Sequence, residues 1–182
     1  DLKPSIRPRT DWADHTRRAR GRLTPENDPS FLLVHHTESP TPTRRAQVPR
    51  AIRGFFDYHT GPKRWPDVAY NFFVAPDGSV WEGRAGSLDG PVTADATGGN
   101  QGYAQLVCLI GDFENQAPTP AAQESLMRML IFLADRYDVD AEVAKGQWEF
   151  QIGPANTVEV VLPNSGKWLP QYRMRSYKEY AF

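Results

Sequence analysis

The sequence predicts a single α/β domain with a central mixed β-sheet and helices on both of its faces. Residues 31–34 and 104–113 form largely apolar runs, which are typical of strands buried on both sides of a sheet. Between them, the turn sequence APDG at 75–78 separates two further apolar segments, and this pattern indicates a β-hairpin. Two other stretches carry apolar residues at helical spacing. Such a mixture over 182 residues is typical of one α/β domain.

The first half of the chain yields an extension, a strand and a helix. Residues 1–30 are polar and interrupted by prolines, and we expect them to form an extension that packs on a domain spanning 31–182. The segment SFLLVHHT then predicts a short buried strand that ends at two histidines. From about Gln47 the apolar positions recur at helical spacing, and the segment YHTGP should end this helix.

The middle of the chain predicts a hairpin, a strand and a second helix. The hairpin is expected within AYNFFVAPDGSVWEGR, and the next buried strand within AQLVCLIGDF. Thr119 and Pro120 then form a good N-cap and N1 pair. The helix that they begin carries four apolar residues on one face: Leu126, Met129, Leu130 and Leu133.

The pattern weakens after Asp138, so residues 138–182 are expected to be a divergent C-terminal part of the domain. Within it, WEFQIGPANTVEVVLPNSGKW indicates a hairpin or an extended pair of strands. Its turns are expected at Gly153-Pro154 and Asn164-Ser165-Gly166. The tail YRMRSYKEYAF is interpreted as a final strand.

The composition argues against several classes of protein. A formal net charge of −1 gives no support to a nucleic-acid partner, which requires a clustered basic face. The arginines of residues 7–22 lie in a stretch that also contains Asp11, Asp14 and Glu26, so they are interpreted as a solvated surface. No apolar run approaches the roughly 20 residues of a membrane helix, and no signal peptide is present. The chain is therefore expected to be either cytosolic or a mature form whose export signal was removed.

The four histidines of the chain include one adjacent pair, His35 and His36. Neighbours in a strand point to opposite faces, so at most one of the two can face a cleft and bind a metal. The position suits a site, because α/β folds place their sites at the carboxyl ends of strands. The alternative is that His35 only caps the strand through hydrogen bonds.

Several motifs occur in a fixed order along the chain. They are IRPRTDW, LLVHHTESP, IRGFFDYHTGPKRWPDVAYNFFVAPDGSVWEGRAG and LVCLIGDF followed by PTPAAQESL. Over roughly residues 5–137 the chain resembles the peptidoglycan recognition protein family and its relatives, the zinc-dependent N-acetylmuramoyl-L-alanine amidases of the second type. The segment that begins at Trp65 and ends at Arg84 is similar to that family's W-x-D-I-G-Y-N-F…D-G-x-x-Y-E-G-R motif almost position for position.

The resemblance implies a role for each matching residue. His35 would bind zinc, His36 would pack on the other face, and Thr37 would line a groove for the stem peptide. Tyr70 would lie beside the metal and assist catalysis. The floor and walls of the substrate groove would include Trp65, Asn71 and Arg84. Two alternatives are purely structural: Trp65 as a core residue, and Arg84 as the partner of Glu82 or Asp67.

The resemblance also implies a reaction and a partner. Three protein ligands would leave one zinc position for a water molecule of lowered pKa. The resulting hydroxide would attack the amide between the muramic acid lactyl group and L-alanine, with Tyr70 stabilising the oxyanion or ordering the water. The expected partner is bacterial peptidoglycan or a muramyl peptide, and the expected location is secreted or cell-wall associated.

The chain departs from the family at the other zinc ligands. The family takes these from a C-terminal G-H-R-D…C-P-G stretch, which this sequence lacks. Of the remaining histidines, His15 lies in the extension, and His59 matches a family histidine that is not a ligand. Cys108 lies within an apolar strand and is interpreted as a buried core thiol. Asp95 stands where relatives typically carry histidine.

Two alignments of the C-terminal part stay open. LPNSGKWL is either a diverged C-P-G segment, with Asn164 at the third ligand position, or part of an insertion that precedes G-H-R-D. Glu159 or Asp140 could replace a ligand, but the spacing selects neither. The sequence thus leaves three hypotheses: a metalloamidase completed by unidentified residues, a non-catalytic peptidoglycan-binding module that has lost its zinc site, or a domain that retains only the fold.

Overall fold

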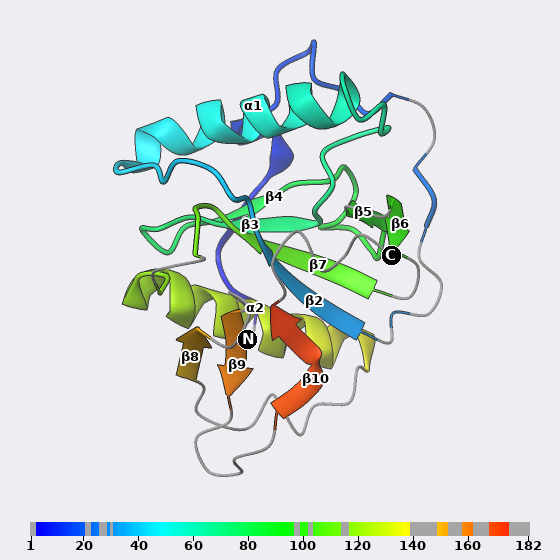
Figure 1. Ribbon diagram of the computed structural model, residues 1–182. Coiled ribbons are helices and arrows are strands. Elements are labelled where there is room, and N and C mark those ends of the chain that lie inside the picture. The colour runs from blue at the N-terminus through cyan, green and yellow to red at the C-terminus, as the bar shows by residue number, and fades with distance from the viewer. Residues whose placement is uncertain are drawn as a thin grey trace.

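The structure of the chain is a computed structural model (Figure 1). It describes residues 3–20, 23–25, 29, 31–96, 99–101, 104–113, 117–138, 149–152, 158–161 and 168–174, the last three ranges by their backbone. The strands are β1 Ile6–Arg7, β2 Phe31–His36, β3 Phe72–Val74, β4 Val80–Glu82, β5 Ala94–Ala96, β6 Gly99–Gln101, β7 Ala104–Leu109, β8 Glu149–Ile152, β9 Val158–Val161 and β10 Trp168–Met174. The helices are α1 Val48–Thr60 and α2 Pro120–Tyr137, with short 3-10 turns at Arg9–Asp11 and Arg45–Gln47.

A five-stranded sheet of order β1-β4-β3-β7-β2 forms the centre of the domain. Strands β3 and β4 are the antiparallel hairpin, whereas β3–β7, β7–β2 and β1–β4 pair in parallel. Helix α1 covers one face of this sheet and α2 covers the other (Figure 1). The predicted fold class, a mixed sheet flanked by helices on both faces, is therefore confirmed.

Helix α2 begins where its cap residue predicts. The Thr119 hydroxyl accepts a hydrogen bond from the Ala122 N–H at 3.1 Å, and Pro120 occupies the first turn. The helix ends at Asp138, which adopts the left-handed conformation with φ 51°. Its apolar face packs on side chains of the sheet, and this cluster includes Leu32, Val34, Phe72, Val107, Leu109, Leu126, Met129 and Leu133.

The opposite face of the sheet forms a second core under α1. This cluster includes Trp12, Ile52, Phe56, Tyr70, Phe73, Trp81, Leu106 and Cys108. Trp12, from the N-terminal segment, is fully buried there, and its indole N–H donates to the Glu82 carbonyl at 2.6 Å. Strand β1 extends the sheet beside β4, so the N-terminal segment contributes to both the sheet and the core.

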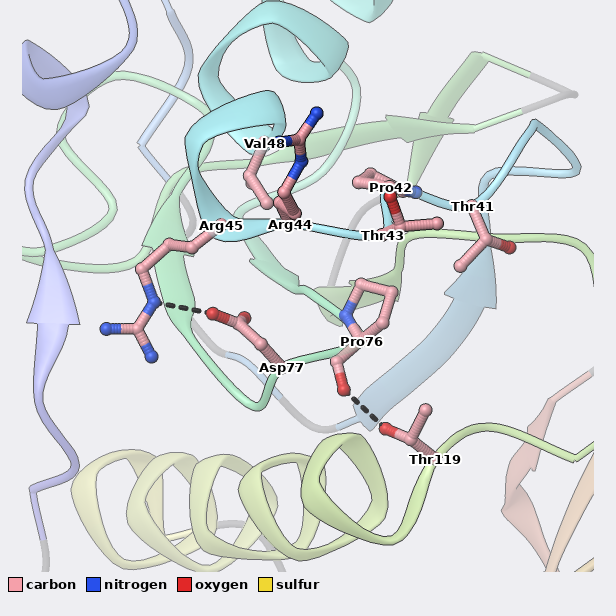
Figure 2. A pocket seen from close by; sticks show the side chains of 9 residues that line it. All are labelled: Thr41, Pro42, Thr43, Arg44, Arg45, Val48, Pro76, Asp77 and Thr119. Carbon is pink, nitrogen blue, oxygen red and sulfur yellow. Dashed lines mark hydrogen bonds and ion pairs between the residues drawn. The ribbon is translucent and has the colours of Figure 1, made fainter.

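The starts of both helices meet the hairpin turn at a cavity of about 380 Å³ (Figure 2). Arg45 pairs with Asp77 of the turn at 2.5 Å, and the Thr119 hydroxyl donates to the Pro76 carbonyl at 2.5 Å. Tight packing also surrounds Gly78 in this turn, whose φ of 81° is typical of glycine. These contacts fasten the hairpin to the N-terminal ends of α1 and α2.

The C-terminal part contributes a smaller sheet of order β10-β9-β8, and β10 lies alongside β2. Strands β8 and β9 are antiparallel, as the expected hairpin requires. Strand β10 begins at Trp168 rather than within the tail, because its pairing with β9 already starts there. The register is irregular between Trp168 and Arg173, a stretch that contains Pro170, which cannot donate a ladder hydrogen bond. The predicted turns at 153–154 and 164–166 lie outside the described residues.

Candidate functional site

A pocket of about 220 Å³ opens where β2 ends beside the last turns of α1. We call it the β2–α1 pocket, and its lining comes from the loop after β2, from α1 and from the segment before β3: Thr37, Glu38, Phe55, Tyr58, His59 and Tyr70. The cavity at the hairpin turn is larger, but it is lined mainly by an exposed ion pair and proline and threonine side chains. We place the candidate site in the β2–α1 pocket because two buried histidines, His35 and His59, adjoin it.

The histidine pair at the end of β2 divides between the two faces of the sheet. His35 lies opposite Cys108 in the β2–β7 register, and its ring centroid is 5.7 Å from that of Tyr70. Burial lowers the pKa of His35 to about 4, and the neighbouring His36 acts in the same direction. His36 points to the α2 face, where its Nδ1 accepts a hydrogen bond from the Phe113 N–H at 3.0 Å. The two rings therefore cannot share one metal, as strand alternation predicts.

Tyr70 lies at the centre of an aromatic cluster that forms the inner wall of the pocket. Its ring centroid lies 5.7 Å from His35, 5.6 Å from His59 and 5.6 Å from Phe73. Behind it, burial raises the pKa of the Cys108 thiol, and a hydrogen bond with the Tyr70 side chain acts in the opposite direction. Cys108 is completely buried, so its interpretation as a core thiol is confirmed.

His59 forms a wall of the pocket at the last turn of α1. Its Nδ1 accepts a hydrogen bond from the Ala69 N–H at 3.0 Å, so in the neutral ring the proton is on Nε2. Burial lowers the pKa of His59 to about 4, and the positive charges of Arg84 and Lys63 add to the effect. His59 is therefore neutral near pH 7 and held in one orientation by the backbone.

Three pocket residues on α1 were absent from the predicted site set. Phe55, Tyr58 and His59 are spaced i, i+3 and i+4, which places them on one face of the helix. Tyr58 is 50% exposed, unusual for so large an apolar side chain in this domain. The signal in the sequence was the spacing of these three ring side chains along the helix that follows the HHT strand. His59 also belongs to the buried face of α1, together with Ile52 and Phe56.

Two of the predicted groove residues occupy different depths. Trp65 is half-buried and packs against His59 with a centroid distance of 5.1 Å, and Lys63 Nζ lies 5.8 Å from its ring. Asn71 is completely buried. Its side-chain NH₂ donates to the Val92 carbonyl at 2.8 Å and its oxygen accepts from the Leu106 N–H at 2.8 Å. Asn71 thus fastens the sheet beneath the pocket, and a direct contact with substrate stays a prediction.

Arg84 is also buried, with 2% of its surface exposed. Its guanidinium donates to the Val68 carbonyl at 3.1 Å and the Thr93 carbonyl at 2.5 Å, and it pairs with Asp95. The proposed pairing with Glu82 or Asp67 is therefore wrong. Both of those carboxylates instead accept hydrogen bonds from Arg9. The backbone N–H of Arg9 donates to Glu82, and its guanidinium donates to Asp67.

The described side chains do not make a complete zinc site. Among them, no group of three or more His, Cys, Asp or Glu lies close enough to hold a metal ion. Of the replacement ligands considered from the sequence, Glu159 lies in β9 opposite Arg173, described by its backbone. Asp140 and Asn164 lie outside the described residues. The role of His35 as a zinc ligand stays a prediction, and its partner ligands are not identified among the described residues.

Solved structures with the same fold are peptidoglycan recognition proteins. The Drosophila recognition protein SD matches with a TM-score of 0.67 at 18% identity, over 76% of this chain and 79% of that one. The recognition protein LE, solved in complex with tracheal cytotoxin, a monomeric diaminopimelic acid-type peptidoglycan, matches with a TM-score of 0.64 at 27% identity, over 75% and 77%. The fold is therefore that of peptidoglycan recognition proteins.

Sequence comparison leads to the same group of proteins. The chain is 34% identical over 135 residues to the N-acetylmuramoyl-L-alanine amidase of Homo sapiens, covering 73% of this chain and 23% of that protein. It is 26% identical over 110 residues to peptidoglycan-recognition protein 2 of Holotrichia diomphalia, covering 60% of this chain and 57% of that one. The chain thus spans only part of each of these relatives.

A family model described as N-acetylmuramoyl-L-alanine amidase matches residues 25–161 of the chain. This range includes β2, the whole β2–α1 pocket and α2, so the match covers the elements that build the candidate site. The resemblance inferred from the ordered motifs is confirmed. The chain belongs to the N-acetylmuramoyl-L-alanine amidase family.

Proposed function

We propose that this domain binds the stem peptide of a muramyl peptide in the β2–α1 pocket. The observation that carries the proposal is the convergence of Thr37, His59 and Tyr70 on one pocket at the carboxyl end of β2. Ligands of α/β sheets commonly bind at this end of the strands. The solved complexes of recognition protein LE with tracheal cytotoxin and of human PGRP-IBETAC with glycosamyl muramyl pentapeptide support the ligand class.

The chemistry of the pocket suits a peptide that carries both apolar and charged groups. Phe55 and Tyr58 offer ring surfaces for packing against alanine methyl groups and the sugar-linked lactyl group. The Thr37 hydroxyl, which accepts a hydrogen bond from the Gly111 N–H at 2.9 Å, is oriented at the pocket edge. Lys63 lies 5.9 Å from the Tyr58 ring, and its positive charge suits the carboxylates of a stem peptide.

Hydrolysis of the N-acetylmuramoyl-L-alanine amide is the second candidate function. The contact between the rings of His35 and Tyr70 favours it, because the family resemblance makes these two residues a zinc ligand and its catalytic neighbour. Zinc would supply an activated water and polarise the scissile carbonyl. The described side chains do not fit a complete set of zinc ligands, so binding of the stem peptide is the function that the geometry supports better.

Calorimetric titration of the full chain with muramyl tripeptide tests the binding proposal, with N-acetylmuramic acid as the control ligand. Tyr58→Ala should weaken tripeptide binding by about tenfold or more, since removing an aromatic anchor costs this much in binding surfaces. Arg128→Ala, which changes an exposed residue on the distant helix α2, should leave binding unchanged. Equal binding of tripeptide by both variants would contradict the pocket assignment.

Zinc content and amide cleavage distinguish the two candidate functions. The zinc bound per chain is measured after dialysis against metal-free buffer, and free stem peptide is measured after incubation with muramyl tripeptide. One retained zinc together with released peptide, both lost in His35→Ala, would establish the amidase function. Tripeptide binding without zinc or cleavage would establish a binding module.

We also propose that the protein acts outside the cytosol, as a secreted or cell-wall-associated protein, because its proposed ligand is a cell-wall polymer. No helix in the described part of the chain is long and apolar enough to cross a membrane. Detection of the protein in medium, wall and cell fractions tests this proposal. Its restriction to the cytosolic fraction would contradict it.

A further inference from the structure

The segment Val68–Tyr70 carries Tyr70 into the pocket without belonging to any strand. Its three carbonyl groups each accept one hydrogen bond. The Arg84 side chain donates to Val68 O at 3.1 Å, the Asp95 N–H donates to Ala69 O at 3.1 Å, and the Arg84 N–H donates to Tyr70 O at 2.8 Å. Two residues, Arg84 and Asp95, therefore supply a donor to each of the three carbonyl groups of this segment.

Arg84 and Asp95 are also bound to each other. Their side chains form a buried ion pair, and a second arm of the guanidinium donates to the Thr93 carbonyl at 2.5 Å. A planar guanidinium can make these bonds simultaneously because its N–H groups point outward in a rigid fork. The pair consequently sets the distance between the segment Val68–Tyr70 and strand β5, which carries Asp95.

The position of this segment determines two walls of the pocket. The Ala69 N–H holds His59 Nδ1 at 3.0 Å, and the Tyr70 ring packs on both His35 and His59. A displacement of the segment would move Tyr70 directly and would release the His59 ring from its backbone donor.

We propose that the Arg84–Asp95 ion pair is a positioning device that holds Tyr70 and His59 in the geometry of the β2–α1 pocket. Arg84 then acts through the backbone beneath the pocket and does not contact the ligand. The consequence for ligand binding rests on the proposed function, whereas the consequence for local order does not. Asp95 is a residue whose part in the site neither the motif comparison nor the pocket lining assigns.

The test compares single and double variants of the pair. Arg84→Met and Asp95→Leu each leave one buried charge without its partner, so both should lower the melting temperature. The double variant Arg84→Met/Asp95→Leu removes both charges and should melt above either single variant. It still lacks the bond from the Arg84 side chain to Val68, so positioning should remain impaired while stability recovers.

Two measurements report positioning separately from stability. Amide hydrogen exchange is followed at Ala69, whose N–H binds His59, relative to Ile110, whose N–H binds the Val74 carbonyl in the sheet. Affinity for muramyl tripeptide is measured on the same proteins. Met129→Ala serves as a matched control, because it destabilises the core on the opposite face of the sheet.

In Arg84→Met and in the double variant, exchange at Ala69 should accelerate by about tenfold relative to Ile110, as a local opening would produce. Tripeptide affinity should fall in the same variants, while Met129→Ala should change neither ratio nor affinity. If Arg84→Met cannot be purified, Arg84→Lys takes its place. Lysine keeps the positive charge but lacks the forked guanidinium, so this variant should fold and show the same faster exchange at Ala69. A wild-type exchange ratio in the double variant, or in Arg84→Lys, would overturn the proposal. Failure of the unaltered chain to bind tripeptide would overturn the proposed function alone, since the exchange result decides the positioning role by itself.

Discussion

The two histidines next to the pocket, His35 and His59, are buried deeply enough that their pKa falls to about 4. Desolvation is the largest cause for both, because the interior disfavours an imidazolium ion. In His59 the ring is further held by the Ala69 N–H, a donor that binds only an unprotonated nitrogen. Near neutral pH, both rings are therefore uncharged, the form in which histidine can bind a metal. In His59, Nδ1 is already occupied by the Ala69 N–H, so its Nε2–H is a hydrogen-bond donor.

The lowered pKa of His59 predicts a loss of stability in acid. In the unfolded chain, His59 becomes protonated as the pH falls through about 6.5, whereas in the folded chain it stays neutral until about pH 4. The stability that depends on neutral His59 is therefore complete above about pH 6.5 and is lost as the pH falls from 6.5 to 4. The loss is on the order of 3 kcal/mol at most. Unfolding by urea at pH 7 and pH 4 should show a smaller loss for His59→Gln than for wild type. The exposed His15→Gln variant is the control, and an identical pH dependence for His59→Gln would contradict the prediction.

Close packing around Gly83 leaves no room for a side chain at this position. A Cβ at this position would overlap the Tyr70 carbonyl and lie 2.9 Å from Phe73 Cε2. Gly83→Ala should therefore lower the free energy of unfolding by about 1–3 kcal/mol, the usual cost of overpacking. In contrast, a Cβ at Gly54, within α1, meets nothing within 4 Å, so Gly54→Ala should stabilise by about 0.5–1 kcal/mol. Urea unfolding of both variants checks the pair, and equal effects would refute the packing argument.

At the scale of secondary-structure elements, short polar links place the helices on the sheet. Thr119 is the clearest case, because its hydroxyl both accepts from the Ala122 N–H and donates to the Pro76 carbonyl of the hairpin turn (Figure 2). The residue thus caps α2 and fastens it to the β3–β4 hairpin. Arg45 provides the corresponding link from the start of α1 to Asp77 of the same turn.

Removal of this cap should be measurable on the whole domain. Thr119→Ala should lower the free energy of unfolding by roughly 1–2 kcal/mol, the usual cost of a lost N-cap. Thr119→Ser retains the hydroxyl and should recover most of that loss. Thermal unfolding of the two variants under the same conditions makes the comparison. If serine were no better than alanine, the hydrogen bonds of Thr119 would not be the source of the effect.

Local patterns in the sequence predicted the elements that depend on local chemistry. The cap at Thr119, the turn at 75–78 and the apolar spacing of α1 each belong to a short window of sequence. The pairing of β1 with β4 was not predicted, because Ile6 and Arg7 form too short a strand to show alternation. The prediction that His35 and His36 lie on opposite faces of the sheet is confirmed, since strand geometry alone decides it.

The parts of the candidate site that were missed depend on contacts between distant residues. The structural alternative for Arg84 was a pairing with Glu82 or Asp67, whereas the fold brings Asp95 to it. The reason is physical: Asp67 is already paired with the Arg9 guanidinium, and Glu82 accepts hydrogen bonds from the backbone N–H groups of Arg9 and Leu88. No periodicity in the sequence predicts these contacts of Arg9, because they join residues far apart in the chain.

At the scale of the whole molecule, one sheet separates two cores, and the candidate site belongs to only one of them. The pocket residues of α1 and the segment that carries Tyr70 are part of, or adjoin, the cluster under α1. The cluster under α2 contains none of the residues that line the pocket. Stability is expected to depend on both cores, whereas ligand binding is expected to depend chiefly on the core under α1.

This separation predicts different effects for two matched core substitutions. Ile52 of α1 and Met129 of α2 are both fully buried, and Ile52→Ala and Met129→Ala should each cost about 2–5 kcal/mol of unfolding free energy. A ligand that binds only the folded state raises the melting temperature in proportion to the logarithm of its concentration over Kd. With muramyl tripeptide present, Met129→Ala should therefore show the wild-type increase in melting temperature. Ile52→Ala should show a smaller increase in melting temperature, because loosening α1 moves Phe55, Tyr58 and His59 together. Equal increases in the two variants would mean that the pocket does not depend on the packing of α1.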